Sequence, residues 1–256
     1  MIKNILNISF FIMYLSVIVP AFNEEKIISE NINKYNNYLK TQNYFYEIII
    51  VNDGSYDNTQ EIIKKICEQN QNIKAINLDK NYGKGYAVKQ GMAQAQGNYH
   101  LFLDADNSTS IDHIEKALSL IQKNEDIIIG SRNPRDTKRT KLIIRQPLWK
   151  ILLGKAGNLL IRILFKIKIH DTQCGFKIFS KKVSNKIFPK LKLNRWLFDL
   201  ETLVLAKKYN YKINIIPVRW VNSEDSRVGI KDYFISFWEL FKIKYNLVFN
   251  RYKIKL

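Results

Sequence analysis

The chain has 256 residues, 46% of them apolar, which is enough for one large domain with a sizeable core. Its two cysteines and three scattered histidines exclude a disulfide scaffold and a His/Cys zinc cluster, and they favour a reducing compartment. Residues 1–134 have 13 basic and 15 acidic residues, whereas residues 135–256 have 28 basic and 8 acidic ones. The net charge of +18 therefore comes from the second half of the chain. This asymmetry indicates that the second half meets an anion: nucleic acid, lipid phosphate or a membrane surface.

The N-terminal stretch Ile5–Val19 is apolar, but polar residues interrupt it and Pro20 ends it, so it is short for a membrane span. Its last residues, Leu15–Val19, form the first predicted core strand. Cleavage of a signal peptide after this strand would destroy the fold. We therefore expect residues 1–13 to be a leader that is dispensable or touches a membrane weakly.

Residues 14–134 alternate between short apolar runs and segments with helical periodicity. The predicted strands are Leu15–Val19, Glu47–Val51, Ile73–Asn77, Tyr99–Leu103 and Asp126–Gly130. The predicted helices are Glu24–Lys40, Asn58–Gln69, Gly85–Ala95 and Ser110–Lys123. This alternation predicts βαβ units, and hence an α/β fold whose mostly parallel, twisted sheet has helices on both faces.

The second half has a different pattern. A polar, basic loop over Asn133–Lys141 precedes a predicted helix over Pro147–Ile169, on which Lys155, Arg162 and Lys166 share one arc. The remaining predicted elements are a turn and strand over Asp171–Ser180, a helix over Arg195–Tyr209 and a strand over Tyr211–Val221 that carries Pro217. Proline removes a ladder hydrogen bond, so the last strand is expected near an edge or at its end.

The C-terminal segment, residues 223–256, is basic and aromatic. Over Lys231–Phe249 the charged and polar residues lie on one side of a helix and the aromatic residues on the other. Such a helix either lies in a membrane interface or packs its aromatic face on the domain core. The basic helix before it offers a second membrane contact.

Four polar turns follow four of the predicted strands in order. They are Pro20–Glu25, Asn52–Ser55, Gly83–Gly85 and Asp104–Asp106. In an open α/β sheet such turns collect at the carboxyl edge of the strands, where ligands bind. Each turn alone has an ordinary explanation as a loop or helix cap, but four in order predict one site.

The residue types in these turns can contact the parts of a nucleotide. The carboxylate of Asp53 can accept a hydrogen bond from a pyrimidine ring N–H. The helix that begins near Lys84, between two glycines, lets backbone N–H groups approach an anion. Asp104 and Asp106 are hard ligands that can hold a divalent cation against a diphosphate.

With these turns, the chain resembles the inverting glycosyltransferases of family 2, which have the GT-A nucleotide-sugar-binding fold. The motifs are Val17–Glu24, Val51–Thr59, Asn81–Gly85, Asp104–Asp106 and Gly130–Arg132. Three motifs of the second half resemble the dolichyl-phosphate β-glucosyltransferase branch, and they are Asp171–Lys177, Arg195–Glu201 and Pro217–Trp220. The resemblance covers about Leu15 to Trp220, and it implies a domain over residues 14–222, with a donor half (14–134) and an acceptor half (135–222).

The resemblance implies transfer of a hexose, most often glucose from UDP-glucose, to a polyprenyl or dolichyl phosphate at the cytoplasmic face of a membrane, where the protein is peripheral or weakly anchored. Mg²⁺ or Mn²⁺ on Asp104 and Asp106 is the implied cofactor. The acceptor phosphate is already ionised at neutral pH, so positioning and charge neutralisation are the main catalytic tasks.

The resemblance also assigns roles to single residues. Pro20, Phe22, Glu24 and Asp53 would line the nucleoside site, Lys84 would approach the phosphates, and Arg132 would pair with the acceptor phosphate. The sugar and acceptor end would be shaped by Gln173, Arg195, Trp196, Asp199 and Glu201. Asp199 would act as a base if one is needed. A structural role for Asp199 and Glu201, as partners of a buried Arg195, stays open at this point.

The sequence departs from the family pattern in two of its motifs. Asn52 replaces the more usual first aspartate of the Asp-Asp-Gly-Ser turn, and Arg227 stands where related enzymes often have lysine, which makes Arg227 a candidate phosphate ligand. The rival hypotheses are another donor sugar such as mannose or GlcNAc, a saccharide or protein acceptor, a sugar nucleotidyltransferase and a nucleic-acid-binding protein. No nucleic-acid-binding motif is recognisable, so we expect no nucleic-acid partner.

Overall fold

The structure is a computed structural model that describes residues 14–123, 125–137, 148–220 and 230–254. It has one seven-stranded sheet in the order β3-β2-β1-β4-β6-β5-β7. The strands are β1 (Leu15–Ala21), β2 (Tyr46–Asn52), β3 (Ile73–Asn77), β4 (Tyr99–Leu103), β5 (Ile127–Ser131), β6 (Phe176–Ser180) and β7 (Ile213–Pro217). Every neighbouring pair is parallel except the two that β6 makes, with β4 and with β5. The expected mostly parallel sheet is confirmed.

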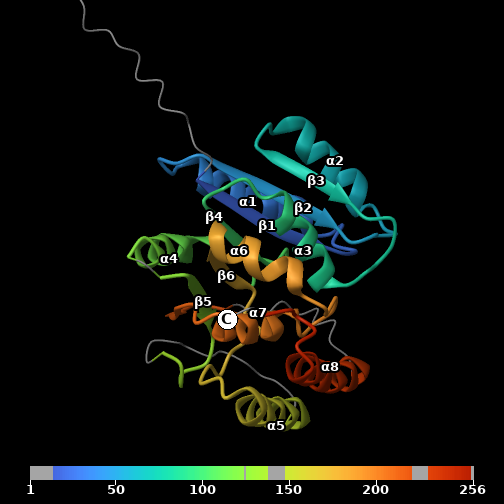
Figure 1. The fold of residues 1–256 in the computed structure, drawn as a ribbon. Helices are drawn as coiled ribbons and strands as arrows, with labels where there is room; N and C mark the ends of the chain where they lie inside the picture. The colour runs from blue at the N-terminus through green and yellow to red at the C-terminus, as the bar shows by residue number, and fades with distance from the viewer. Residues whose placement is uncertain (1–13, 124, 138–147, 221–229, 255–256) are drawn as a thin grey trace, which may run out of the picture.

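Helices cover both faces of the sheet (Figure 1). One face is covered by α1 (Ile28–Lys40), α2 (Thr59–Gln69) and η1 with α4 (Ile111–His113, Ile114–Ile121). The other is covered by α3 (Lys84–Gln94), α6 (Lys181–Ile187), η2 (Phe188–Lys190) and α7 (Phe198–Lys208). In α1, α2 and α4 the apolar residues recur at helical spacing, so each helix packs one apolar side against the first face of the sheet.

Two long helices, α5 (Leu148–Phe165) and α8 (Ile230–Val248), lie next to each other beyond α7 (Figure 1). Each adds buried residues to the core on the α3 side, including Ile161 from α5 and Ile243 from α8. Among the described residues, no helix has the length and apolar character needed to cross a membrane. The predicted leader at residues 1–13 lies outside the described part of the chain.

Each predicted strand is present, but the last is shorter than predicted. Of the predicted range Tyr211–Val221, β7 covers Ile213–Pro217, and Val221 lies outside the described residues. As expected, β7 is an edge strand and ends at Pro217. The helix α6 and the short η2 were not predicted, because Lys181–Lys190 has few apolar residues in a regular pattern. The reversed direction of β6 has a consequence for the site. Its first residues lie at the edge where the other strands end, since Leu103 pairs with Phe176.

Candidate active site

The turns that follow β1 and β2 are joined by hydrogen bonds. The N–H of Asn23 donates to Ser55 Oγ at 2.9 Å, and the N–H of Glu24 donates to Thr59 Oγ1 at 2.8 Å. Asn23 has a left-handed φ of 53°, which asparagine tolerates. These contacts place the predicted nucleoside residues Pro20, Phe22 and Glu24 beside the turn that contains Asp53.

Asp53 is buried and holds the loop before α3. Its Oδ1 accepts from the N–H of Tyr82 at 2.9 Å, and its Oδ2 accepts from the N–H of Gly83 at 2.8 Å. Burial raises the pKa of Asp53, and these two N–H groups oppose that rise. The carboxylate therefore fixes the start of α3, and its predicted contact with a uracil ring remains a prediction.

Lys84, the first residue of α3, pairs with Asp104, and their Nζ and Oδ1 atoms are 2.6 Å apart. The two side chains are 26% and 25% exposed, so the pair borders solvent. Burial alone would lower the pKa of Lys84, but the charges of Asp104 and Asp199 raise it above its usual value. Lys84 therefore stays cationic at the position where its sequence motif predicts phosphate binding.

The Asp104–Asp106 turn is held rigidly by α1. Tyr35 Oη donates to the carbonyl oxygen of Asp104 at 2.7 Å, and Asn31 Nδ2 donates to that of Ala105 at 2.9 Å. The carboxylate of Asp106 accepts from Ser108 at both oxygens, from its N–H at 2.9 Å and from its Oγ at 2.7 Å. The turn is thus preorganised before any ligand arrives.

These two carboxylates fit a divalent cation. Within the described residues, no cluster of three or more His, Cys, Asp or Glu side chains has a metal-binding arrangement, so the protein itself offers two acidic ligands. Mg²⁺ is commonly bound in this way, by one or two carboxylates together with waters and substrate phosphates. Asp104 already pairs with one positive charge, that of Lys84.

Gly175, directly before β6, is needed for this turn to form. A Cβ atom at Gly175 would lie 1.8 Å from Oδ2 of Asp104, which is a steric overlap. The N–H of Asp104 also donates to the carbonyl oxygen of Gly175 at 3.3 Å. The Asp171–Lys177 motif and the aspartate pair are therefore one wall of the same site.

Behind Lys84 lies a buried ion pair that sequence analysis did not find. Lys177 and Asp199 are 1% and 5% exposed at their side chains, and Nζ of the lysine is 2.7 Å from Oδ1 of the aspartate. Lys177 also donates to the carbonyl oxygen of Cys174 at 2.6 Å. Burial raises the pKa of Asp199, and Lys177 and Lys84 oppose that rise. The available signal was one lysine within the apolar run Phe176–Phe179.

Arg132 is bound by Asp171 in a two-point contact. Its Nε lies 2.8 Å from Oδ2 and its Nη2 lies 2.8 Å from Oδ1 of that carboxylate, and its backbone N–H also donates to Oδ2. The ring centroid of Trp220 is 5.5 Å from the guanidinium carbon. Burial opposes the charge of Arg132, but Asp171 raises the pKa of Arg132 above its usual value.

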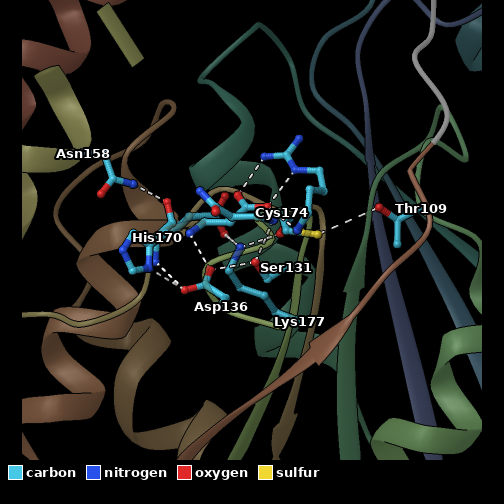
Figure 2. Close-up of polar contacts among 11 residues, drawn as sticks. Thr109, Ser131, Asp136, Asn158, His170, Cys174 and Lys177 are labelled. Carbon is cyan, nitrogen blue, oxygen red and sulfur yellow. Dashed lines mark hydrogen bonds and ion pairs between the residues drawn. The ribbon is translucent and has the colours of Figure 1, made fainter. Parts of the chain in front are cut away.

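Asp171 is held in turn by a polar network around Asp136 (Figure 2). Asp136 accepts from the N–H of Asp171 at 2.9 Å, from Ser131 Oγ at 2.7 Å and from His170 Nδ1 at 2.8 Å. Asn158 of α5 donates to the carbonyl oxygen of His170, which connects α5 to the network. The position of Arg132 is therefore fixed from several elements.

The remaining predicted residues lie at different places. The Trp196 ring is 5.8 Å from Lys84 Nζ, whereas Gln173 and Arg195 are exposed. Arg195 is thus not the buried partner that we considered for Asp199 and Glu201. Glu201 is fully buried, and its carboxylate accepts from Tyr252 Oη and from the N–H groups of Lys192 and Leu193, which gives it a structural role. Arg227 lies outside the described residues.

The model of glycosyl transferase family 2 matches residues 16–188. A dolichyl-phosphate beta-glucosyltransferase of Trichomonas vaginalis, ALG5A, is 36% identical over 242 residues, which are 90% of this chain and 73% of that protein. The dolichyl-phosphate beta-glucosyltransferases of Dictyostelium discoideum and Saccharomyces cerevisiae are 35% and 33% identical, over 84% and 85% of this chain and 69% and 70% of their own lengths.

Solved structures show the same fold. Mannosyl-3-phosphoglycerate synthase from Rubrobacter xylanophilus matches 95% of this chain and 76% of its own, with a TM-score of 0.66 and 11% identity. Residues 1–349 of TarS from S. aureus match 91% of this chain and 66% of their own, with a TM-score of 0.57 and 23% identity. Glucosyl-3-phosphoglycerate synthase from Mycobacterium tuberculosis, in complex with Mn²⁺, UDP-glucose and phosphoglyceric acid, matches with a TM-score of 0.62 and 14% identity over 91% of this chain and 80% of its own.

Proposed function

The chain belongs to glycosyltransferase family 2, among the relatives of the dolichyl-phosphate β-glucosyltransferases, and we propose that it transfers glucose from UDP-glucose to a polyprenyl phosphate with inversion at the anomeric carbon. One observation supports this proposal most directly. Asp53, Lys84 and the Asp104–Asp106 turn, which come from three different strand ends, meet at one edge of the sheet. A base, a diphosphate and a cation require these three kinds of group side by side.

At the donor end, the roles follow from the positions of the charges. Pro20, Phe22 and Glu24 would line the nucleoside site together with Asp53, and Lys84 would bind the phosphates. Asp104 and Asp106 would hold Mg²⁺ or Mn²⁺, which neutralises a diphosphate leaving group when it is bound. The Mn²⁺ and UDP-glucose in the mycobacterial complex support a divalent cation and a uridine donor.

At the acceptor end, Arg132 would bind the acceptor phosphate. A guanidinium has five N–H donors, of which the pair with Asp171 uses two, so the others can contact a phosphate. The phosphate oxygen would attack the anomeric carbon while the bond to the diphosphate breaks, and no proton needs to be removed. Asp199 would act as a base only for an acceptor that requires one. Gln173, Trp196 and Arg227 remain candidate contacts for the sugar and acceptor.

A membrane surface is the proposed place of action, on the cytoplasmic side, with the protein bound peripherally. The support is an exposed apolar surface on α5 and α8, formed by Leu159, Ile163, Phe234, Phe237, Trp238, Phe241, Tyr245, Val248 and Phe249. Basic residues accompany it, including Arg162, Lys166, Lys242 and Lys244. Of the three basic residues predicted to share an arc, the side chain of Lys155 lies outside those described. Aromatic and basic residues together are typical of helices that lie in a membrane interface.

The test is a donor panel with the purified chain, Mg²⁺ or Mn²⁺, and a short polyprenyl phosphate. We expect transfer from UDP-glucose and much less from UDP-GlcNAc, UDP-galactose or GDP-mannose. The matched control is the same prenyl chain with a hydroxyl in place of the phosphate, which should accept no sugar. Transfer to that alcohol or to a saccharide would contradict the phosphate acceptor, and preference for another donor would contradict glucose.

A further inference from the structure

The loop between η2 and α7, residues 191–197, is held at both ends by buried carboxylates. At its start, Glu201 accepts from the N–H groups of Lys192 at 3.1 Å and Leu193 at 3.0 Å. At its end, Oε2 of Glu239 accepts from the N–H of Leu197 at 3.0 Å. Leu197 is the residue that precedes α7, so the charge of Glu239 also lies at the positive end of that helix.

This loop forms part of the donor edge. The carbonyl oxygen of Asn194 accepts from the N–H of Tyr86 at 3.1 Å, and it is so close to Gly83 that a Cβ atom there would lie 2.5 Å from it. Trp196 places its ring 5.8 Å from Lys84 Nζ. The loop is therefore in contact with the N-terminal turn of α3, where the diphosphate is proposed to bind.

Glu239 belongs to α8, which has two opposite faces. Glu239, Leu240 and Ile243 are 5%, 4% and 0% exposed and point into the protein. Phe237 and Trp238 of the same helix are 49% and 67% exposed. Beyond the helix, Tyr252 donates from Oη to Glu201 at 2.6 Å, so the C-terminal segment supports the start of the loop as well.

We propose that Glu239 is a positioning residue for nucleotide binding, which holds the loop 191–197 against the N-terminal turn of α3 and so couples α8 to the donor edge. The proposal rests on the proposed function in one respect, that the donor is a uridine diphosphate sugar. Glu239 touches no substrate. It acts through the N–H of Leu197, and removal of this carboxylate would take away the acceptor of that buried donor.

Calorimetric binding of UDP with Mg²⁺ by the full chain tests this role, because it needs neither the sugar nor the acceptor. We expect Glu239→Leu to weaken UDP binding about tenfold or more, since a charged hydrogen bond to the loop is lost. Glu239→Gln keeps an oxygen that can accept from Leu197, and its affinity should stay within about threefold of the original. The control is Glu68→Leu, the same substitution at an exposed glutamate of α2, which should bind UDP like the unchanged chain.

Thermal unfolding measured alongside separates positioning from stability. A Glu239→Leu variant that is folded at the assay temperature and binds UDP with unchanged affinity would overturn the inference. If that variant does not fold, Glu239→Asp replaces it. This variant keeps the charge but shortens the side chain by one methylene, so the carboxylate is drawn away from the N–H of Leu197, and unchanged UDP affinity would equally overturn the inference. If the unchanged chain binds no UDP, the uridine donor of the proposed function is overturned, and the positioning role falls with it.

Discussion

Asp53 and Asp104 are joined through two consecutive residues of the chain. Asp53 accepts from the N–H of Gly83 at 2.8 Å, and Asp104 binds the ammonium group of Lys84 at 2.6 Å. The start of α3 thus connects the predicted base-binding carboxylate to the predicted metal-binding carboxylate. Separation of these two at opposite ends of the sheet would have excluded a nucleotide-sugar site.

Asp106→Asn should abolish turnover without unfolding the protein. The amide is a weaker metal ligand, and the loss in kcat should be about 100-fold or more, as for removal of one group that stabilises departing charge. The measurement is kcat at saturating Mg²⁺ and donor, with a melting temperature beside it. Asp112→Asn is the matched control, because Asp112 pairs with the exposed Arg219. Substantial activity in Asp106→Asn would refute the metal assignment.

Arg132→Ala should raise the KM for the prenyl phosphate about tenfold or more, with a much smaller change for the nucleotide sugar. The reason is that a charged contact to the acceptor phosphate is lost. Arg132→Lys keeps the charge but not the two-point contact with Asp171, so its KM for the acceptor should lie between the two. Equal effects on both KM values would remove the proposed acceptor role of Arg132.

Lys177→Met should destabilise the protein strongly, because it leaves Asp199 buried without its ion partner. Breaking such a pair from one side costs about 3–5 kcal/mol in the free energy of unfolding. The double variant Lys177→Met with Asp199→Leu removes both charges and should recover most of that loss. Urea unfolding measures both, and an unaltered midpoint in the single variant would show that Asp199 finds another partner.

The stability of the fold should fall between about pH 6.5 and pH 4 in part because of His100. Burial lowers the pKa of His100 to about 4, against the weaker opposing effect of the Gly97 carbonyl. The unfolded chain binds a proton in this interval that the folded protein does not, so His100 contributes stability above its unfolded pKa that is lost as the pH falls. The contribution approaches about 3 kcal/mol.

The variant His100→Gln isolates this contribution. Its free energy of unfolding, measured by urea at several pH values, should depend less on pH between 6.5 and 4 than that of the unchanged chain. The carboxylates are common to both proteins, so any protonation of them cancels in the difference. Parallel curves for the two proteins would mean that His100 does not titrate in this way.

The double variant Phe237→Ser with Trp238→Ser should lose about tenfold or more of its affinity for anionic vesicles, because two large exposed apolar side chains are removed from the proposed membrane surface. Co-sedimentation with vesicles measures the binding. Phe45→Ser is the control, because Phe45 is 47% exposed in the connection before β2 and outside that surface. Equal loss of binding in both variants would contradict a role of α8.

The donor edge could be predicted from the sequence because each of its motifs directly follows a strand with a clear apolar pattern. Lys84 and Asp104 needed only the rule that parallel strands end at one edge. The partners of Arg132 and Asp199 could not be predicted in this way. Asp171 and Lys177 reach the site because β6 runs antiparallel between β4 and β5, and this direction depends on pairing between distant parts of the chain. Glu201 was expected at the sugar and acceptor end, but it is buried against Tyr252 and the N–H groups of Lys192 and Leu193. Its position along α7, and not its residue type, decides which neighbours it contacts.

The reversed strand also restricts how the enzyme can change. Neighbouring residues of a strand point to opposite faces of a sheet, so a shift of β6 by one residue would carry Lys177 to the wrong core and replace it with an apolar side chain beside Asp199. The same shift would move Gly175 away from Asp104 and bring a side chain into its space. We therefore expect insertions and deletions in β6 to abolish activity. Changes of length in the loops at the opposite edge of the sheet, away from the site, should be tolerated better.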